Sequence, residues 1–195
     1  MAVDFDLGLK EASERLLELS AKLPTPIVLI DGRAGSGKSL FATKLAESYF
    51  SENRQAARIV RLDDLYPGWE GLVAGSVYAR ESIIEPIAAG KEASWQIWDW
   101  EKGVRGAPSE AGNGFREFSG GTALIVEGCG ALSKASAPLS SLRLWIEADS
   151  TKRRLRFSER DKGKFDEYWG VWAAQEEEFY ASERSTELAD LVIQN

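Results

Sequence analysis

The sequence predicts an α/β fold of three layers, in which a central parallel sheet is flanked by helices. Short, continuous apolar runs such as residues 27–30 and 123–126 recur along the chain. Such runs are typical of strands that helices cover on both faces. Stretches with helical spacing separate these runs, and strands that alternate with helices favour a parallel sheet.

The first half of the chain supplies the first of these elements. Residues 6–22 are predicted to form an amphipathic helix, because leucines recur there near helical spacing. Pro24 and Pro26 end this helix, and the apolar strand at 27–30 follows. The next expected elements are a helix at 38–49, a strand at 58–62, a loop at 63–76 that contains Gly and Pro, and a helix at 78–89.

The second half continues the alternation after an irregular stretch. Residues 101–121 are rich in glycine and polar residues and are expected to lack regular structure. Strands are expected at 122–126, 142–146 and 191–193, and helices at 150–160 and 166–182. The chain shows no internal repeat and no low-complexity linker, so we expect residues 1–195 to form one domain, with an N-terminal helical region at 1–24.

Composition excludes several functional classes. The chain has no histidine, which excludes a Ser-His-Asp site and any metal site with histidine ligands. Its net charge of −7 disfavours nucleic-acid binding, which depends on neutralising phosphates. No apolar run is long enough to span a bilayer, and no signal-peptide pattern opens the chain. We therefore expect a cytoplasmic protein without nucleic-acid or membrane partners; its oligomeric state cannot be read from the sequence.

Residues 32–39 form the strongest motif. They fit the pattern G-x-x-x-x-G-K-[S/T] between an apolar strand and a helix, which is the context that a phosphate-binding loop (P-loop) requires. Glycines let backbone N–H groups turn toward phosphates, and the following helix adds its N-terminal dipole. Lys38 is expected to reach the terminal phosphates and Ser39 to ligate Mg²⁺. The predicted nucleotide-binding residues are Gly32, Arg33, Ala34, Gly35, Ser36, Gly37, Lys38, Ser39 and Leu40.

Two carboxylates follow other predicted strands. Asp63 comes after the strand at 58–62, and Glu127 comes after the strand at 122–126. In a parallel α/β sheet the carboxyl ends of the strands face the ligand crevice, so both carboxylates are expected beside the phosphates. Asp63 can accept a hydroxyl proton, and both can help to hold Mg²⁺. The alternative for Asp63 is that it only caps a turn.

A basic segment follows the strand at 142–146. Arg153, Arg156 and Arg160 are spaced to share one helix face, and we predict that residues 150–165 form a lid over the triphosphate. Guanidinium groups there would stabilise charge on the transferring phosphoryl group and exclude water. The alternative is an ordinary solvated helix face.

Aromatic residues are concentrated in two segments. The first, residues 95–100, contains three tryptophans that can stack on a flat ligand, or can be core. The second is a stripe of aromatic residues near helical spacing between residues 165 and 180, which we interpret as core rather than as a ligand site. Cys129 lies between two glycines and is interpreted as a small buried residue, because no histidine exists to activate it.

These motifs, in this order, resemble the uridine kinase and phosphoribulokinase group of P-loop kinases, including uridine-kinase-like ATP-binding proteins of actinobacteria. The resemblance covers about residues 26–164 and rests on GRAGSGKS, RLDDLY, WDW with a following Arg, VEG and DSTKRRLRFSERD. It implies ATP as donor, Mg²⁺ as cofactor and a small-molecule hydroxyl, such as that of a nucleoside, as acceptor. It departs from the family at Gly103, where uridine kinases have a histidine, and at residues 71–75.

The resemblance assigns roles to particular side chains. The expected catalytic residues are Lys38, Asp63, Arg153, Arg156 and Arg160. The expected acceptor pocket consists of Asp63, Tyr66, Trp98, Asp99, Trp100 and Arg105, and the expected Mg²⁺ ligands are Ser39, Asp63 and Glu127. Two alternatives stay open. One is a nucleoside-monophosphate or coenzyme-precursor kinase that uses Arg80, Arg105 and Arg116, and the other is a regulatory ATP-binding protein without transferase activity.

Overall fold

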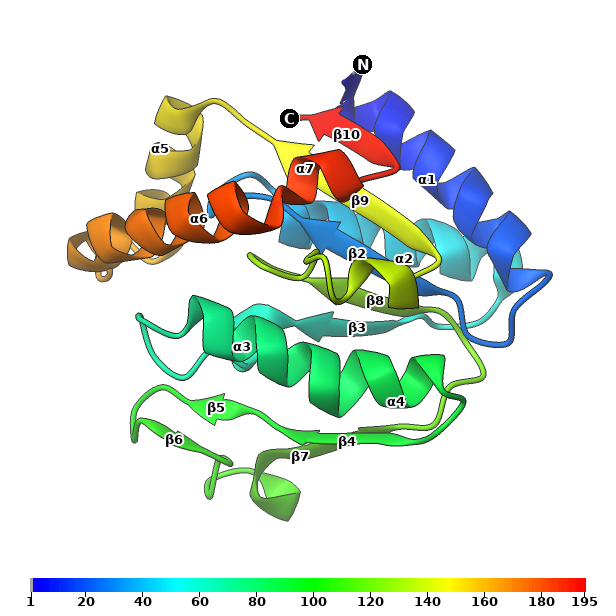
Figure 1. Cartoon of the computed structure of the whole chain (residues 1–195), viewed down its shortest axis with the longest axis horizontal. Coiled ribbons are helices and arrows are strands. Elements are labelled where there is room, and N and C mark those ends of the chain that lie inside the picture. The colour runs from blue at the N-terminus through cyan, green and yellow to red at the C-terminus, as the bar shows by residue number, and fades with distance from the viewer. Residues whose placement is uncertain (1) are drawn as a thin grey trace.

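A six-stranded parallel sheet forms the centre of the protein (Figure 1). The structure is a computed structural model that describes residues 2–195. The spatial order of the strands is β1-β10-β9-β2-β8-β3. Their bounds are β1 Val3–Asp4, β2 Ile27–Asp31, β3 Arg58–Arg61, β8 Leu124–Glu127, β9 Leu142–Glu147 and β10 Leu191–Gln194.

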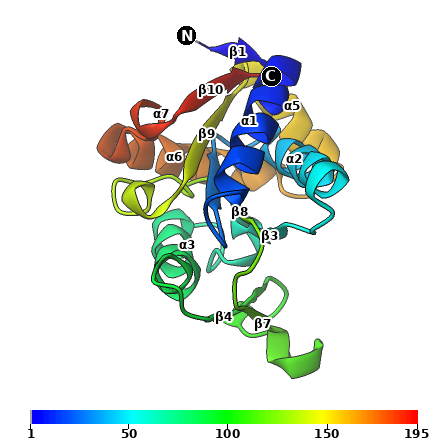
Figure 2. The same cartoon turned by 90° about the vertical axis from the view of Figure 1, so that its right-hand side faces the viewer.

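Helices cover both faces of this sheet, as Figure 2 shows with the sheet nearly edge-on. One face carries α1 (Phe5–Ser20) and α2 (Lys38–Asn53). The other carries α3 (Leu72–Ala79), α4 (Glu85–Ala88) and α6 (Trp169–Glu183). The short helix α7 (Ser185–Leu188) precedes β10, and α5 (Ser150–Arg160) follows β9. The predicted three-layer α/β fold is confirmed.

Strand β2 is apolar at four successive positions because both of its faces are buried. Val28 and Ile30 belong to the core cluster under α1 and α2. Ile27 and Leu29 belong to the cluster under α3 and α6. Since successive side chains of a strand point to opposite faces, a strand covered on both faces must be apolar at every position.

The strand register aligns the functional loops. Ile30 lies opposite Glu127, and Glu127 lies opposite Arg61, so β2, β8 and β3 end side by side. The segments that follow these three strands therefore begin at one edge of the sheet. The P-loop, Glu127 and Asp63 are brought together by this alignment.

The helix predicted at 78–89 begins earlier than expected. Helix α3 starts at Leu72, continues as a π-helical segment from Arg80 to Ile84, and ends as α4. The glycines of residues 71–75 led to the prediction of a loop. Gly75 instead lies inside the helix, where a Cβ would collide with the ring of Tyr66. This position is a glycine because α3 packs closely against the ring of Tyr66, and the glycine does not mark a break in the helix.

Residues 101–121 are more regular than predicted. Strand β7 (Phe115–Phe118) pairs antiparallel with β4 (Ala93–Gln96), and β6 (Val104–Arg105) pairs with β5 (Trp98–Asp99). These short pairs extend beyond β3 at the lower edge of Figure 1. Exposure alternates along β7, as expected for a strand with one covered face. Within residues 2–195, no helix is both long enough and apolar enough to cross a bilayer.

Candidate active site

The P-loop connects β2 to α2 and has the backbone of a phosphate cradle. Gly35 and Gly37 have φ of 76° and 103°, values that residues with a Cβ rarely adopt. A Cβ on Gly35 would also collide with the backbone oxygen of Arg153, and one on Gly37 with the side chain of Asn195. Glycine is therefore required here for both conformation and close packing.

The cradle offers donors that the protein itself does not use. The backbone N–H groups of Gly37, Lys38 and Ser39 donate to no other group in residues 2–195. The buried Ser36 Oγ also has no hydrogen-bond partner within this part of the chain. Unpaired amides at a helix N-terminus bind anions well. This geometry fits the polyphosphate chain of a nucleotide.

Lys38 lies at the centre of this loop and is buried. Its Nζ donates to the backbone oxygens of Gly32 at 2.7 Å and Arg33 at 3.1 Å. Burial alone would lower the pKa of Lys38, but the carboxylates around it, Glu127 foremost and then Glu176 and Asp31, raise the pKa above its ordinary value. The ammonium group therefore stays charged and can attract a phosphate.

The two predicted carboxylates lie at the same sheet edge. Glu127 is buried, and burial raises its pKa although the ammonium of Lys38 opposes the shift. The Ser39 hydroxyl also bonds to Glu127 and lowers its pKa. Asp63 follows β3 in the first turn of a 3-10 helix and is half exposed. One carboxylate is thus fixed beneath the cradle, while the other stays accessible.

Two of the three predicted arginines of α5 contact the P-loop, and the third lies beside Asp63. Arg153 Nη1 donates to the backbone oxygen of Ala34 at 3.3 Å. Arg156 Nη1 lies 3.4 Å from the backbone oxygens of Gly35 and Ser36. Arg160 Nη1 lies 3.3 Å from Asp63 Oδ2. Helix α5 therefore spans the site from the P-loop to Asp63.

A cavity of about 480 Å³ lies among these groups. Its lining consists of the P-loop with several charged side chains and of aromatic rings. The first set consists of Ala34, Gly35, Gly37, Lys38, Ser39, Leu40, Asp63, Glu127, Cys129, Arg156 and Arg160. The rings belong to Tyr66, Trp69, Trp100, Phe157, Phe165 and Trp172. The volume lies within the range of small-molecule sites.

The fold of the chain is shared with solved kinases. It matches a possible uridine kinase from Bacillus stearothermophilus at 15% identity and a TM-score of 0.60, covering 95% of this chain and 99% of that one. A proposed fructose transport system kinase from Silicibacter sp. TM1040 matches at 18% identity and 0.59, covering 95% and 98%. D-glycerate 3-kinase from Cryptococcus neoformans matches at 11% and 0.53, covering 95% and 89%. No family model and no curated protein matches the chain.

The chain has the fold of the P-loop kinases. At 11–18% identity, this likeness establishes the arrangement of the sheet, the P-loop and the helices. It does not carry the acceptor of any of these kinases over to this chain. The acceptor end of the cavity must be interpreted from its own residues.

A cluster of rings centred on Trp69 forms the aromatic part of the cavity wall. The ring of Trp69 lies 5.2 Å from those of Trp100 and Phe165, and 6.3 Å from those of Phe157 and Trp172. Sequence reasoning missed Trp69, which falls in the segment expected to be a loop. It also assigned Phe165 and Trp172 to the core. Trp172 does belong to the buried core cluster and also lines the cavity, whereas Phe165 is only partly buried and lines the cavity.

Only part of the predicted acceptor set lines the cavity. Asp63, Tyr66 and Trp100 do, and Trp100 Nε1 donates to the Asp63 backbone oxygen at 3.0 Å. Trp98, Asp99 and Arg105 do not. The Asp99 carboxylate accepts backbone bonds from residues 101 and 102. Arg105 lies 3.7 Å from the ring centre of Tyr78 and donates to the backbone oxygen of Leu65 at 2.9 Å.

The arginines that were considered as contacts for a phosphorylated acceptor also lie outside the cavity. Arg80 pairs with Glu81 and Glu85. Arg116 pairs with Glu110. Neither arginine lines the cavity, and Arg105 does not either.

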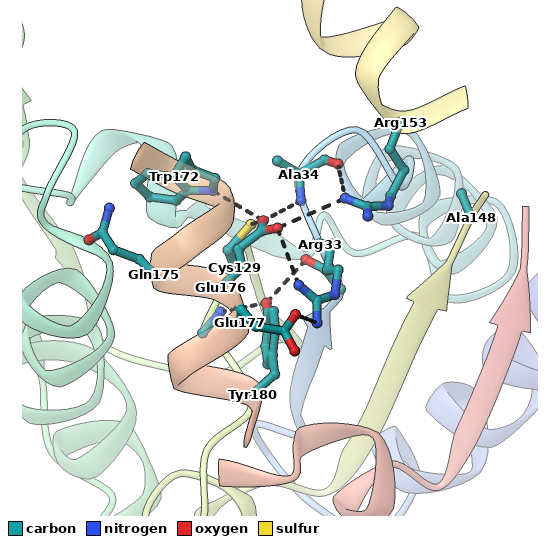
Figure 3. A network of polar contacts seen from close by, with 12 residues as sticks. Arg33, Ala34, Cys129, Ala148, Arg153, Trp172, Gln175, Glu176, Glu177 and Tyr180 are labelled. Atoms are coloured by element: carbon teal, nitrogen blue, oxygen red, sulfur yellow. Dashed lines mark hydrogen bonds and ion pairs between the residues drawn. The ribbon is translucent and has the colours of Figure 1, made fainter. Parts of the chain in front are cut away.

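Glu176 on α6 is a polar site residue that the sequence did not reveal. Its side chain is 1% exposed, and its Oε1 accepts from the backbone N–H of Ala34 at 2.5 Å and from Trp172 Nε1 at 3.1 Å. Oε2 lies 4.0 Å from Arg33 and 3.9 Å from Arg153. Figure 3 shows this carboxylate reaching from α6 toward Ala34, Arg33 and Arg153. Helix α6 is thereby tied to the phosphate cradle.

Cys129 is part of the same network and is not a nucleophile. Its Sγ lies 3.4 Å from Lys38 Nζ and 3.3 Å from Glu176 Oε1. Burial raises the pKa of the Cys129 thiol well above its ordinary value, although the Lys38 ammonium opposes the shift. The thiol therefore stays protonated, in agreement with its interpretation as a small buried residue.

The residues predicted to hold Mg²⁺ have suitable chemistry. Ser39 and Glu127 are adjacent, and the Asp63 carboxylate lies at the same cavity. All three offer oxygen, the ligand that Mg²⁺ prefers. The described residues contain no cluster of three or more acidic or cysteine side chains that would form an all-protein metal cage. Mg²⁺ sites in nucleotide enzymes use one or two carboxylates with phosphates and water, so this donor set fits.

Proposed function

We propose that this protein is an ATP-dependent phosphotransferase that moves the γ-phosphate of ATP–Mg²⁺ to a hydroxyl of a small molecule. The observation that carries the proposal is one cavity shared by the phosphate cradle, Lys38, two carboxylates and two lid arginines. The likeness to kinases of small molecules supports it. A hydrolase needs only water as acceptor, whereas six aromatic side chains also line this cavity and leave room for a larger acceptor.

The cradle and Lys38 would hold the polyphosphate chain through backbone N–H groups and one ammonium. Lys38 Nζ now donates to loop oxygens, and it would turn to the β- and γ-phosphates when these are bound. Ser39, Glu127 and Asp63 would hold Mg²⁺, directly or through water. When bound, Mg²⁺ would neutralise charge on the phosphates.

Asp63 is proposed to orient the acceptor hydroxyl and to accept its proton. In the transfer, the acceptor oxygen forms a bond to the γ-phosphorus while the bond to the β–γ bridging oxygen breaks. ADP leaves with that electron pair, and the hydroxyl proton passes to the Asp63 carboxylate. Arg156 and Arg160 line the same space and would stabilise charge on the moving group.

The test is release of ADP from ATP–Mg²⁺ across a panel of alcohols, nucleosides and sugars. Lys38→Ala is expected to lower acceptor-dependent turnover more than 100-fold, in line with the loss of one preorganised charge. Lys44→Ala is the matched control, because Lys44 lies on the same helix and is exposed. Circular dichroism of both variants checks folding. ATP binding without turnover on any acceptor would instead favour a regulatory ATP-binding protein.

A further inference from the structure

The acceptor end of the cavity is walled by six aromatic side chains from four parts of the chain. Tyr66 and Trp69 follow β3, Trp100 follows β5, Phe157 and Phe165 belong to the lid region, and Trp172 belongs to α6. The charged lining side chains are Lys38, Asp63, Glu127, Arg156 and Arg160, which belong to the phosphate end or face it. A ligand placed beyond Asp63 therefore meets rings.

The polar atoms of three of these rings are already used inside the protein. Tyr66 donates its hydroxyl to the Cys129 backbone oxygen at 2.8 Å. Trp100 Nε1 donates to the Asp63 backbone oxygen, and Trp172 Nε1 donates to Glu176. These rings can thus offer a ligand their faces and edges but not these donors. A polyol placed against these three rings would find no free donor on them, and buried hydroxyl groups without partners cost free energy.

Ring geometry suits a flat ligand. Trp69 stacks on Tyr168 with a centroid distance of 4.7 Å and an angle of 3°. Trp100 and Phe165 are tilted against Trp69 by 54° and 49°, and Trp172 is nearly perpendicular to it at 88°. Rings at these angles present both faces and edges, the two contacts that an aromatic guest makes well.

Charge alone does not select the guest. Aromatic cages also bind quaternary ammonium groups. Three cationic side chains (Lys38, Arg156 and Arg160) and two carboxylates (Asp63 and Glu127) line the cavity. The ATP–Mg²⁺ of the proposed function would add net negative charge beside them, so a cationic alcohol is included among the test probes.

From these observations we infer that the acceptor is an aryl alcohol, in which a flat ring carries the reacting hydroxyl on a short arm and has no further hydroxyl groups. The inference rests on the proposed phosphotransferase function and names its substrate class. The ring lies against the side of Trp69, Trp100 and Phe165 that lines the cavity, and the arm directs the hydroxyl toward Asp63.

The first experiment compares acceptors in the ADP-release assay with wild-type protein and ATP–Mg²⁺. The probes are 2-phenylethanol and indole-3-ethanol as aryl alcohols, ribose and glycerol as polyols, uridine as a ring with a polyol, and choline as a cationic alcohol. We expect kcat/KM for at least one aryl alcohol to exceed that of every other probe more than tenfold. A polyol, uridine or choline that matches or exceeds both aryl alcohols would overturn the inference while leaving the kinase function intact.

A matched pair of variants tests where the ring of the acceptor binds. Phe165→Leu removes a ring of the cavity, and Phe50→Leu removes an exposed ring on α2. Loss of one stacking partner is worth about tenfold in binding. We expect Phe165→Leu to lower kcat/KM for the preferred aryl alcohol about tenfold without changing KM for ATP, and Phe50→Leu to leave both unchanged. Equal effects of the two variants would contradict the placement of the acceptor ring against Phe165.

Calorimetric titration of the protein with 2-phenylethanol, without nucleotide, separates this inference from the proposed function. Saturable binding that Phe165→Leu weakens, together with transfer to no acceptor, would support the ring site and refute the phosphotransferase. Absence of both binding and transfer for aryl alcohols, with Lys38-dependent transfer to another probe, would refute the aryl acceptor alone. If no probe binds or reacts, both proposals fail.

Discussion

Replacing Glu176 by glutamine tests whether α6 is held to the P-loop by one buried carboxylate. The wild-type side chain accepts bonds from the Ala34 amide and the Trp172 indole, and it faces the guanidinium of Arg153 at 3.9 Å. Glutamine preserves the volume of the side chain. It removes the negative charge, and its amide nitrogen cannot accept a hydrogen bond.

The size of the effect follows from these contacts. A hydrogen bond to a charged group contributes about 1.5–3 kcal/mol, and breaking a buried ion pair on one side costs about 3–5 kcal/mol. Glutamine retains one acceptor oxygen, so we expect Glu176→Gln to lower the free energy of unfolding by about 2–4 kcal/mol. For a chain of this size that lowers Tm by about 5–15 °C.

The assay is thermal unfolding followed by circular dichroism, with Glu177→Gln as the control. Glu177 is the next residue of α6, 75% exposed, and pairs with Arg33 at 2.8 Å. An exposed pair contributes less than about 1 kcal/mol, so the control is expected to melt within about 4 °C of wild type. Equal Tm values for the two variants would refute the reasoning that Glu176 is a structural tie between α6 and the P-loop.

Three further predictions concern the site. Asp63→Asn is expected to bind ATP within threefold of wild type (on the order of 1 kcal/mol or less) but to lose about 100-fold or more in turnover; near-normal turnover would remove its assignment as base. Arg160→Gln is expected to lower turnover about 100-fold with little change in Tm, since its pair with Asp63 is half exposed; Arg154→Gln, on the same helix outside the cavity, serves as its control. Burial raises the pKa of Asp31 from 3.8 to about 6. Its contribution to stability is therefore complete below about pH 4 and is lost as the pH rises through 6, by about 3 kcal/mol. The free energy of unfolding in urea, measured between pH 4 and pH 7.5, should show this loss in wild type and not in Asp31→Asn. If it changes with pH in the same way in both proteins, the prediction is contradicted.

The phosphate end of the site was predictable because its determinants are local. The P-loop pattern fixes backbone conformation through Gly35 and Gly37, and the continuous apolar run of β2 specifies burial on both faces. Parallel strands then bring Glu127 and Asp63 to the same edge without further information. Helical spacing placed Arg153, Arg156 and Arg160 on one face of α5.

The acceptor end was less predictable because it depends on packing between distant segments. Trp69, Trp100 and Trp172 lie far apart in the chain and meet only once α6 covers α3 and the segment after β3. Aromatic residues at helical spacing look alike whether they face a core or a cavity. Gly75 is a similar case. In the sequence it looked like a loop signal, because the contact with Tyr66 that explains a glycine inside a helix is visible only in the structure.

The sequence by itself thus determined the parallel α/β fold, the phosphate cradle, the two carboxylates at the sheet edge and the arginine face of the lid. Each depends on a short pattern, because backbone conformation and strand ends are set by neighbours in the chain. Only the tertiary structure decided that Arg105 and Asp99 lie outside the cavity, that Glu176 joins α6 to Ala34, and that aromatic rings line the cavity. Those features depend on the relative position of helices and loops, which side-chain packing fixes over the whole domain.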